Sequence, residues 1–132
     1  MKPYRVLVTG SRDWEDRAAI DDFLTALAAA NTFHNRETVI VHGACPTGAD
    51  AMADDWARWH AARSPLIGFE RHPANWRPGG ILDRSAGFRR NAEMIRLGAD
   101  ICLAFIRNGS RGASHTARLA EEAGILVRRW TA

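Results

Sequence analysis

The chain has 132 residues, of which 46% are hydrophobic and 25% charged. This length and composition fit a single soluble globular domain and exclude a dinucleotide-binding domain joined to a separate substrate domain. Of the 18 basic residues, 17 are arginine and one is Lys2, which excludes a P-loop and Schiff-base chemistry. Residues 1–66 carry 7 basic and 9 acidic groups, whereas residues 67–132 carry 11 and 6. The second half therefore favours either an anionic ligand or a solvated arginine-rich helix.

The two cysteines, Cys45 and Cys102, do not have C-x-x-C spacing, and no His, Cys or acidic residues have metal-ligand spacing. We therefore expect reduced thiols, no metal site and no cofactor. Cys45 has no base near it in the sequence and is interpreted as incidental. No apolar run reaches about 18 residues, and the chain enters a strand pattern directly, without a signal-peptide pattern. These features predict a cytoplasmic protein with no membrane partner.

The predicted strands and helices alternate along the chain. Apolar and β-branched runs predict strands at residues 4–9, 38–42, 65–69, 100–106 and 125–130. Apolar residues at helical spacing predict helices at about residues 15–30, 49–62, 86–97 and 113–123. We expect a long loop at residues 71–84, which contain two prolines and the Gly79-Gly80 pair.

Strands that alternate with helices and lack a period of two indicate a parallel sheet buried on both faces. We therefore expect an α/β fold, with one Rossmann-like domain over residues 1–132. Its doubly wound sheet would have about five mainly parallel strands and helices on both faces. Ligands of such sheets bind beyond the carboxyl ends of the strands, and the unusual residues of this chain follow its predicted strands.

The segment after the first predicted strand is the first candidate for a binding site. Gly10 permits a tight turn, and Ser11, Arg12 and the following amides can face an anion at the start of the next helix. The alternative is a helix cap made by Ser11 or Asp13.

The second candidate runs from His42 to Asp50. His42 and Gly43 end the second predicted strand, and Gly48 precedes the next helix, so the loop exposes backbone N–H groups. Thr47 and Asp50 have the spacing of a capping box, which satisfies the first amides of a helix. On this local rule Asp50 is interpreted as structural rather than catalytic.

The third candidate, Arg89-Arg90-Asn91, opens the helix predicted at residues 86–97. A cation at a helix N-terminus is unfavourable unless an anion accompanies it. We therefore expect Arg89 or Arg90 to bind a phosphate or carboxylate, with Asn91 fixing the geometry. The alternative is a solvated arginine pair.

The fourth candidate is Gly109-Ser110-Arg111-Gly112, which precedes the last predicted helix. Glycines that flank Ser-Arg before a helix can form a phosphate cradle from backbone amides and a hydroxyl. The alternative is a plain glycine turn with Ser114 as the N-cap. His115 lies in the first helical turn, and its spacing assigns it no partner.

Five tryptophans are many for this length. Trp56 and Trp59 are typical of core or interface residues on a helix. Trp14 and Trp76 lie in predicted loops, where an aromatic side chain stacks on a nucleobase or covers the edge of the sheet. For Trp76 both interpretations stay open.

Taken together, the four motifs resemble the SLOG superfamily, and most closely its small YspA-type branch, over about residues 4–130. The motifs are Thr9-Gly10-Ser11-Arg12, His42-Gly43-x4-Gly48-Ala49-Asp50, Arg89-Arg90-Asn91 and Gly109-Ser110-Arg111-Gly112-Ala113. The resemblance, which extends to DprA-like domains, implies a Rossmann-like sheet that binds nucleotides or nucleotide-derived molecules at the strand ends. It also implies a homo-oligomer.

Related LOG-type phosphoribohydrolases cleave the N-glycosidic bond of a nucleoside monophosphate. Their signature resembles G-G-x-G-T-x-x-E, in which the glutamate is catalytic. In this chain the matching run is 109–116, and Thr116 stands where the glutamate would be. Because an oxocarbenium-like ribosyl centre requires a carboxylate, Asp50 and Asp13, with His115, remain as the candidates for catalysis.

We expect a binding module for a nucleotide or nucleotide-derived ligand, in bacterial or phage signalling or defence. The alternatives are a phosphoribohydrolase-like N-glycosidase and a nucleic-acid-binding protein, although no nucleic-acid recognition motif accompanies the basic half. The expected partners are a nucleotide-like small molecule and further copies of the chain. The candidate ligand-binding residues are Gly10, Ser11, Arg12, His42, Gly43, Gly48, Asp50, Arg89, Arg90, Asn91, Gly109, Ser110, Arg111 and Gly112.

Overall fold

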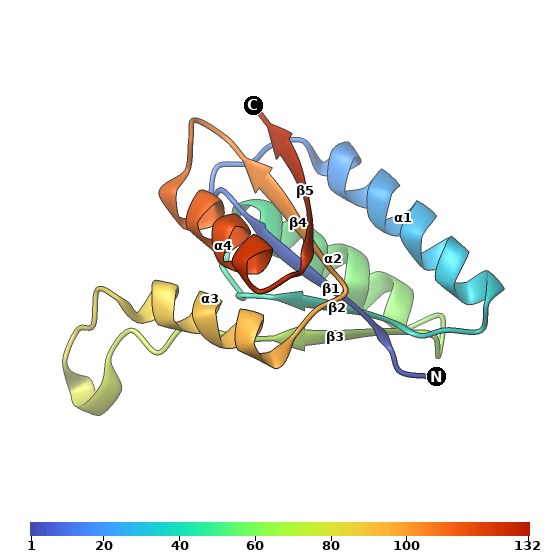
Figure 1. Cartoon of the computed structure of the whole chain (residues 1–132), viewed down its shortest axis with the longest axis horizontal. Coiled ribbons are helices and arrows are strands. Elements are labelled where there is room, and N and C mark those ends of the chain that lie inside the picture. Colours follow the sequence, from blue (N-terminus) through green and yellow to red (C-terminus); the bar gives the residue numbers. More distant parts are fainter.

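Five parallel strands form the central sheet of the computed structural model, which describes residues 1–132. The strands are β1 (Tyr4–Gly10), β2 (Thr38–His42), β3 (Ile67–Arg71), β4 (Ile101–Ile106) and β5 (Leu126–Thr131). Their order across the sheet is β3-β2-β1-β4-β5, and every neighbouring pair is parallel (Figure 1). The expected α/β fold with one doubly wound sheet is confirmed.

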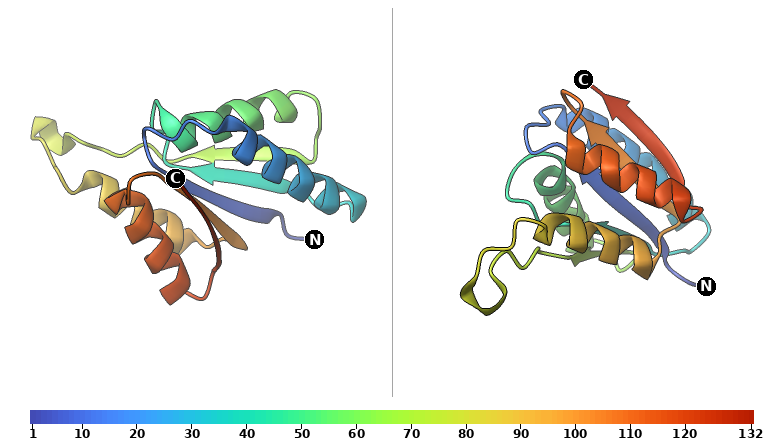
Figure 2. Two further views of the ribbon diagram at one scale, coloured as in Figure 1. Left: turned by 90° about the horizontal axis from the view of Figure 1, so that it is seen from above. Right: turned by 60° about the vertical axis from the view of Figure 1, so that its left-hand side comes forward.

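Helices cover both faces of the sheet (Figure 2). One face carries α1 (Arg17–Phe33) and α2 (Gly48–Ala61), and the other carries α3 (Ala86–Leu97) and α4 (Arg111–Glu122). A short 3-10 turn, η1 (Pro78–Gly80), lies in the loop between β3 and α3 and stands away from the sheet in Figure 1. None of the helices combines the length and the apolar character that crossing a bilayer requires.

The central strands are buried on both faces, which is why their sequences do not alternate between apolar and polar residues. Val6 and Val8 of β1 pack in one cluster with Trp56 of α2, whereas Leu7 packs in another with Met94 of α3. Burial of each large apolar side chain stabilises the fold by about 1.5–3 kcal/mol. The two helical layers are therefore held to the sheet by separate apolar clusters.

The tryptophans divide between the core and the surface. Phe105 of β4 packs against Trp14 at a ring-centroid distance of 5.5 Å and stacks on Trp130 at 4.5 Å. Trp14 is buried and so belongs to the core rather than to a ligand site. On α2, Trp56 is buried, whereas Trp59 is largely exposed.

The start of α1 differs from the expected one because Asp16 caps it. The Asp16 carboxylate accepts a hydrogen bond from the backbone N–H of Ala19 (3.1 Å). Neither Ser11 nor Asp13 is the N-cap, so the cap suggested for them is wrong. The helix also continues beyond residue 30, to Phe33.

The starts of α2 and α4 also correct two predicted caps. Thr47 precedes α2 but makes no side-chain hydrogen bond to it, so the predicted capping box is wrong. Helix α4 begins at Arg111 after Ser110, which means that Ser114 lies inside the helix. In both cases the chain turns into the helix without a side-chain cap.

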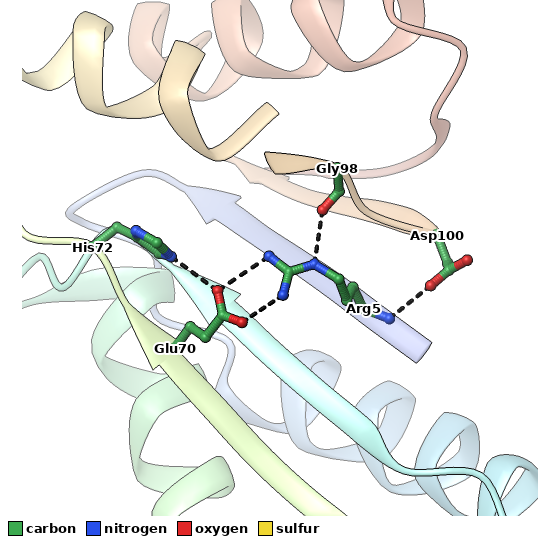
Figure 3. A network of polar contacts seen from close by, with 5 residues as sticks. All are labelled: Arg5, Glu70, His72, Gly98 and Asp100. Carbon is green, nitrogen blue, oxygen red and sulfur yellow. Dashed lines mark hydrogen bonds and ion pairs between the residues drawn. The ribbon is translucent and has the colours of Figure 1, made fainter. Parts of the chain in front are cut away.

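A polar network joins β1 to the edge strand β3 and to the end of α3 (Figure 3). The Arg5 guanidinium pairs with both carboxylate oxygens of Glu70, one of them at 3.1 Å, and its Nε donates to the Gly98 carbonyl oxygen (2.9 Å). His72 Nε2 lies 3.1 Å from the same Glu70 carboxylate. Hydrogen bonding to Arg5 is the main cause that lowers the pKa of Glu70. The network anchors the point at which the loop to α3 leaves the sheet.

Candidate ligand-binding site

A cavity of about 330 Å³ lies at the carboxyl ends of β1 and β4. The strand order reverses at this pair, because β2 and β3 lie beyond β1 while β5 lies beyond β4. The walls come from the β1–α1 loop, the first turns of α2, α3 and α4, and the β3–α3 loop. Doubly wound sheets bind ligands at this position.

Residues 10–13 of the β1–α1 loop line the cavity. A Cβ at Gly10 would lie 2.3 Å from the Cβ of Ala49, so only glycine allows α2 to approach β1 this closely. The Ser11 hydroxyl accepts a hydrogen bond from the Arg107 backbone N–H (2.7 Å) and donates to the Arg107 carbonyl oxygen (3.3 Å). Ser11 thus borders the cavity, but its hydroxyl binds the β4–α4 loop.

His42 lies behind the cavity rather than in its lining. Its side chain is fully buried, and its Nε2 is 2.8 Å from Oδ1 of Asp54. The Nδ1 atom accepts a hydrogen bond from the Ala44 backbone N–H (3.0 Å). Because Nδ1 is an acceptor, the ring proton resides on Nε2 and is donated to Asp54. His42 therefore holds the β2–α2 loop and does not contact the cavity.

Asp50 borders the cavity and is 6% exposed. Its Oδ2 accepts hydrogen bonds from the backbone N–H groups of Gly43 (3.2 Å) and Cys45 (3.4 Å). Asp50 thus binds the amides of the preceding loop and not those of its own helix. Burial raises the pKa of Asp50, against the lowering effect of His42, Cys45 and Arg90.

Cys45, interpreted from the sequence as incidental, also lines the cavity. Burial is the main cause that raises the pKa of its thiol, and the Asp50 carboxylate raises it further. Cys45 and Cys102 are both unpaired, and burial raises the pKa of Cys102 to about 12. A raised pKa lowers the thiolate fraction of both side chains.

Arg90 links α3 to the β2–α2 loop. One guanidinium nitrogen donates to the carbonyl oxygens of Gly43 and His72, the latter at 3.2 Å, and Nε donates to Oδ1 of Asn91 (2.7 Å). A Cβ at Gly43 would lie 2.6 Å from this guanidinium, which explains the glycine. Arg90 and Asn91 both line the cavity, whereas Gly43 does not.

Arg89 and Gly48 lie outside the cavity lining. Arg89 forms an ion pair with Asp83 of the β3–α3 loop. Gly48 has a φ of +74°, and a Cβ there would lie 2.2 Å from the Ser11 carbonyl oxygen. Gly48 thus permits a close approach of two loops. The two adjacent arginines therefore bind different segments. Arg90 binds backbone carbonyl oxygens of Gly43 and His72, whereas Arg89 binds Asp83 of the β3–α3 loop.

The start of α4 forms another wall of the cavity, through Ser110, Gly112 and Ala113. The backbone N–H groups of the first three helical residues have no acceptor within the protein, and the helix has no side-chain cap. Arg111 is exposed and Gly109 has a φ of +61°, and neither lines the cavity. Of the residues of the predicted cradle, Ser110 and Gly112 thus line the cavity, beside helix-terminal amides that have no acceptor.

His115 and Thr116 are not among the residues that line the cavity. The His115 ring meets the edge of the Phe88 ring at a centroid distance of 5.1 Å, and its Nδ1 has no hydrogen-bond partner. Thr116 is fully buried, and its hydroxyl donates to the Gly112 carbonyl oxygen (3.0 Å). Thr116, which the resemblance places at the position of the phosphoribohydrolase glutamate, is thus a buried residue of α4.

The β3–α3 loop contributes two lining residues that the sequence did not assign to the site, Trp76 and Arg84. The Arg12 guanidinium lies 5.8 Å from the centre of the Trp76 ring. Phe88 and Gly87, at the start of α3, complete this wall, and the Trp76 ring edge lies against Gly87. For Trp76 the sequence left open whether the ring contacts a ligand or covers the edge of the sheet. Arg84 does not follow a strand, so no sequence pattern pointed to it as a site residue.

The charges of the cavity are only partly balanced within the protein. Arg12 and Arg84 form no ion pair, whereas Arg89 and Arg107 are paired with carboxylates. Asp13 also lines the cavity, at its exposed rim. No group of three or more His, Cys, Asp or Glu side chains is arranged to hold a metal ion.

Comparison with known proteins shows to which family the chain belongs. Residues 4–79, from β1 to η1, match the YspA, cpYpsA-related SLOG family. The chain is also 42% identical over 125 residues to the Gene 61 protein of Mycobacterium phage D29, an alignment that covers 93% of each chain. The chain therefore belongs to the YspA, cpYpsA-related SLOG family.

Proposed function

We propose that the cavity binds a nucleotide or a nucleotide-derived molecule. The observation that carries this proposal is the combination, at the switch point of the sheet, of unsatisfied helix-terminal amides with two arginines, Arg12 and Arg84, whose guanidinium groups form neither an ion pair nor a hydrogen bond within the protein. Phosphate groups bind at such amides, because the N–H groups and the helix dipole both favour an anion. The family membership supports the same class of ligand.

The phosphate is assigned to the start of α4, where Ser110, Gly112 and Ala113 border the cavity. Arg12 and Arg84 extend over the cavity from two different loops, and each guanidinium can form a bidentate pair with a phosphate. The start of α3 adds two more free amides, those of Gly87 and Phe88, to the opposite wall. Two helix N-termini and two arginines thus line the same cavity and favour an anion there.

The nucleobase is assigned to the mouth of the cavity. Trp76 and Phe88 line it there and are 40% and 46% exposed. Aromatic faces that are both exposed and next to a phosphate site favour stacking with a base. Under this assignment Trp76 stacks on a nucleobase, which is the first of the two roles considered for it from the sequence.

Calorimetric titration with nucleoside 5′-monophosphates, cyclic nucleotides and ADP-ribose tests the proposal. At least one of them should bind, and Arg84→Gln and Arg12→Gln should each weaken that binding by about tenfold to hundredfold, the value of a charge-assisted hydrogen bond. Arg77→Gln is the matched control, because Arg77 lies on the same loop but does not line the cavity. Binding by none of these compounds, or equal losses in all three variants, would contradict the proposal.

A second candidate function is hydrolysis of an N-glycosidic bond, favoured by a single observation. Asp50 is a buried acid with a raised pKa at the edge of the cavity, a combination common among catalytic groups. In this reaction Asp50 would take a proton from water as the water oxygen adds to the sugar C1′, while the C1′–N bond breaks and the base leaves with its electron pair and takes up a proton from solvent. Release of free base from AMP or GMP, abolished in Asp50→Asn, would support it. No release from acid to neutral pH would contradict it.

We further propose that the chain self-associates through the β3–α3 loop. Ile81 and Leu82 are 76% and 45% exposed on this loop, which also carries the lining residues Trp76 and Arg84. A second copy would remove these apolar side chains from water and cover the mouth. Size-exclusion chromatography with light scattering should show an oligomer that the double variant Ile81→Ser, Leu82→Ser dissociates. A monomer at all concentrations would contradict this proposal.

A further inference from the structure

Three side chains on the floor of the cavity are almost fully buried and yet present polar atoms without a partner in the protein. Thr9, Asp50 and Asn91 are 7%, 6% and 8% exposed, and all three line the cavity. Thr9 Oγ1 and Asn91 Nδ2 form no hydrogen bond within the protein, and Asp50 Oδ1 receives no backbone N–H, since both amides that bind this carboxylate, beside the Cys45 thiol, go to Oδ2. None of these three atoms is among the buried atoms that lack a hydrogen-bond partner, and the cavity is the space that their residues line. Buried polar groups without partners are costly, which makes them markers of a ligand.

The neighbours of these side chains fix the role of each free atom. Oδ2 of Asp50 is engaged by the Gly43 and Cys45 amides, which leaves Oδ1 as an acceptor. Oδ1 of Asn91 accepts from Arg90 Nε, so its NH₂ group is the donor that faces the cavity. The Thr9 hydroxyl can do both. The floor therefore offers an acceptor, a donor and a hydroxyl close together.

This set fits neighbouring hydroxyl groups better than a phosphate or a base. Asp50 has no ion pair, and a phosphate beside its carboxylate would be repelled. A guanine edge would be bound best by both oxygens of a carboxylate, but Asp50 has only one free. Each sugar hydroxyl donates one hydrogen bond and accepts up to two, so neighbouring hydroxyl groups can use both the acceptor and the donor of the floor.

We propose that Asp50 and Asn91, with Thr9, bind the hydroxyl groups of the ligand's sugar, so that the site selects ribonucleotides over 2′-deoxyribonucleotides. The proposal rests on the proposed function, because it assigns the floor of the same cavity. It places the sugar between the phosphate at the start of α4 and the base at the mouth. Asp50 and Asn91 are thus specificity-determining residues.

Calorimetry with two matched pairs, AMP against 2′-dAMP and GMP against 2′-dGMP, tests the selection. The ribonucleotide of each pair should bind about tenfold or more tightly, because the deoxy analogue leaves a buried acceptor unpaired. In Asp50→Asn the NH₂ group replaces either the acceptor that faces the ligand or the oxygen that binds the Gly43 and Cys45 amides. This variant should reduce the ratio of ribonucleotide to deoxyribonucleotide affinity to about twofold. The control Asp55→Asn removes an exposed carboxylate of the same helix, and it should keep the full ratio.

The outcomes separate this inference from the function on which it rests. Equal binding of ribo and deoxy forms by the unmodified protein overturns the inference and leaves nucleotide binding intact. A preference for one base that ignores the sugar also overturns it. Binding of none of the four removes the proposed function and the inference together. If Asp50→Asn is unfolded by circular dichroism, Asn91→Ser takes its place, and a ratio that it leaves unchanged overturns the inference.

Discussion

The two sides of the cavity are built from the same residue types and differ in how those residues are used. The closed side is the end of β2 and the β2–α2 loop, residues 42–48, together with Arg90. The open side is the β3–α3 loop and the start of α4, residues 76–84 and 109–113. On the closed side a Cβ at Gly43 or Gly48 would collide with other atoms, whereas at Gly79, Gly80, Gly109 and Gly112 it would meet nothing within 4 Å.

The charged groups follow the same division. On the closed side His42 is held by Asp54, and Arg90 by backbone carbonyl oxygens. On the open side Arg84 forms no ion pair and the first amides of α4 have no acceptor. The comparison teaches that glycines and arginines beside a strand end are scaffold where the protein satisfies them, and candidates for binding where it does not.

The largest expected effect comes from a glycine of the closed side. Gly48→Ala forces a positive φ on alanine and places a Cβ 2.2 Å from the Ser11 carbonyl oxygen, so we expect a loss of about 2–5 kcal/mol in the free energy of unfolding. The matched change on the open side, Gly112→Ala, should stay within about 0.5 kcal/mol. Urea denaturation of both variants measures the difference in unfolding free energy. Equal losses of stability in the two variants would contradict the distinction between the closed and the open side.

A smaller effect is expected from the buried pair of the closed side. Asp54→Ala leaves the Nε2–H of His42 without an acceptor in a fully buried position, which should cost about 1–3 kcal/mol. The adjacent control, Asp55→Ala, removes only an exposed pair with Arg17 and should cost at most about 1 kcal/mol. Thermal unfolding of the two variants is the measurement. A cost for Asp55→Ala as large as that for Asp54→Ala would show that the pair does not hold the loop.

The smallest effect concerns the network beneath α3 and depends on pH. The pKa of Glu70 is lowered from its usual 4.5 by hydrogen bonds to Arg5 and then His72. A lowered pKa stabilises the fold at pH values above 4.5, and this contribution is lost as the pH falls through the folded-state pKa. Because Glu70 is half-exposed, we expect it to be worth about 0.2–1 kcal/mol.

Glu70→Gln provides the test of this pH dependence. The difference in unfolding free energy between the variant and the unmodified protein should be constant near neutral pH and should shrink as the pH falls below 4.5. Urea denaturation at a series of pH values measures it. A difference that grows on acidification would mean that the ion pair is not the cause.

The sequence predicted the sheet well because its strands carry their own signal. Apolar, β-branched runs marked all five, and β2 was predicted with its observed bounds, Thr38–His42. Edge strand β3 was placed too early, since only Ile67 of its five residues is buried and the pattern is weak. Helix starts were less predictable, because which residue becomes the N-cap, here Asp16, depends on the conformation of the preceding loop.

The cavity was predicted in position but only partly in composition. Strand-end motifs placed Arg12, Asp50 and Asn91 in its lining, because carboxyl ends of parallel strands meet at one edge. They also included His42 and Arg89, which bind Asp54 and Asp83 instead. Such partners are distant in sequence, so spacing does not reveal whether a side chain is already satisfied. Arg84 was missed for the same reason, since a long loop folds back by contacts that no local pattern encodes.

The most direct test of the central claim is to observe which side of the cavity a nucleotide touches. At 14.6 kDa, the protein suits ¹⁵N–¹H correlation spectra recorded during a titration with AMP. We expect the largest shifts at the backbone amides of Gly112 and Ala113 and at the indole N–H of Trp76, while the His42 ring signals stay in place. An absence of shifts, or the largest shifts at His42 and its neighbours, would contradict the account.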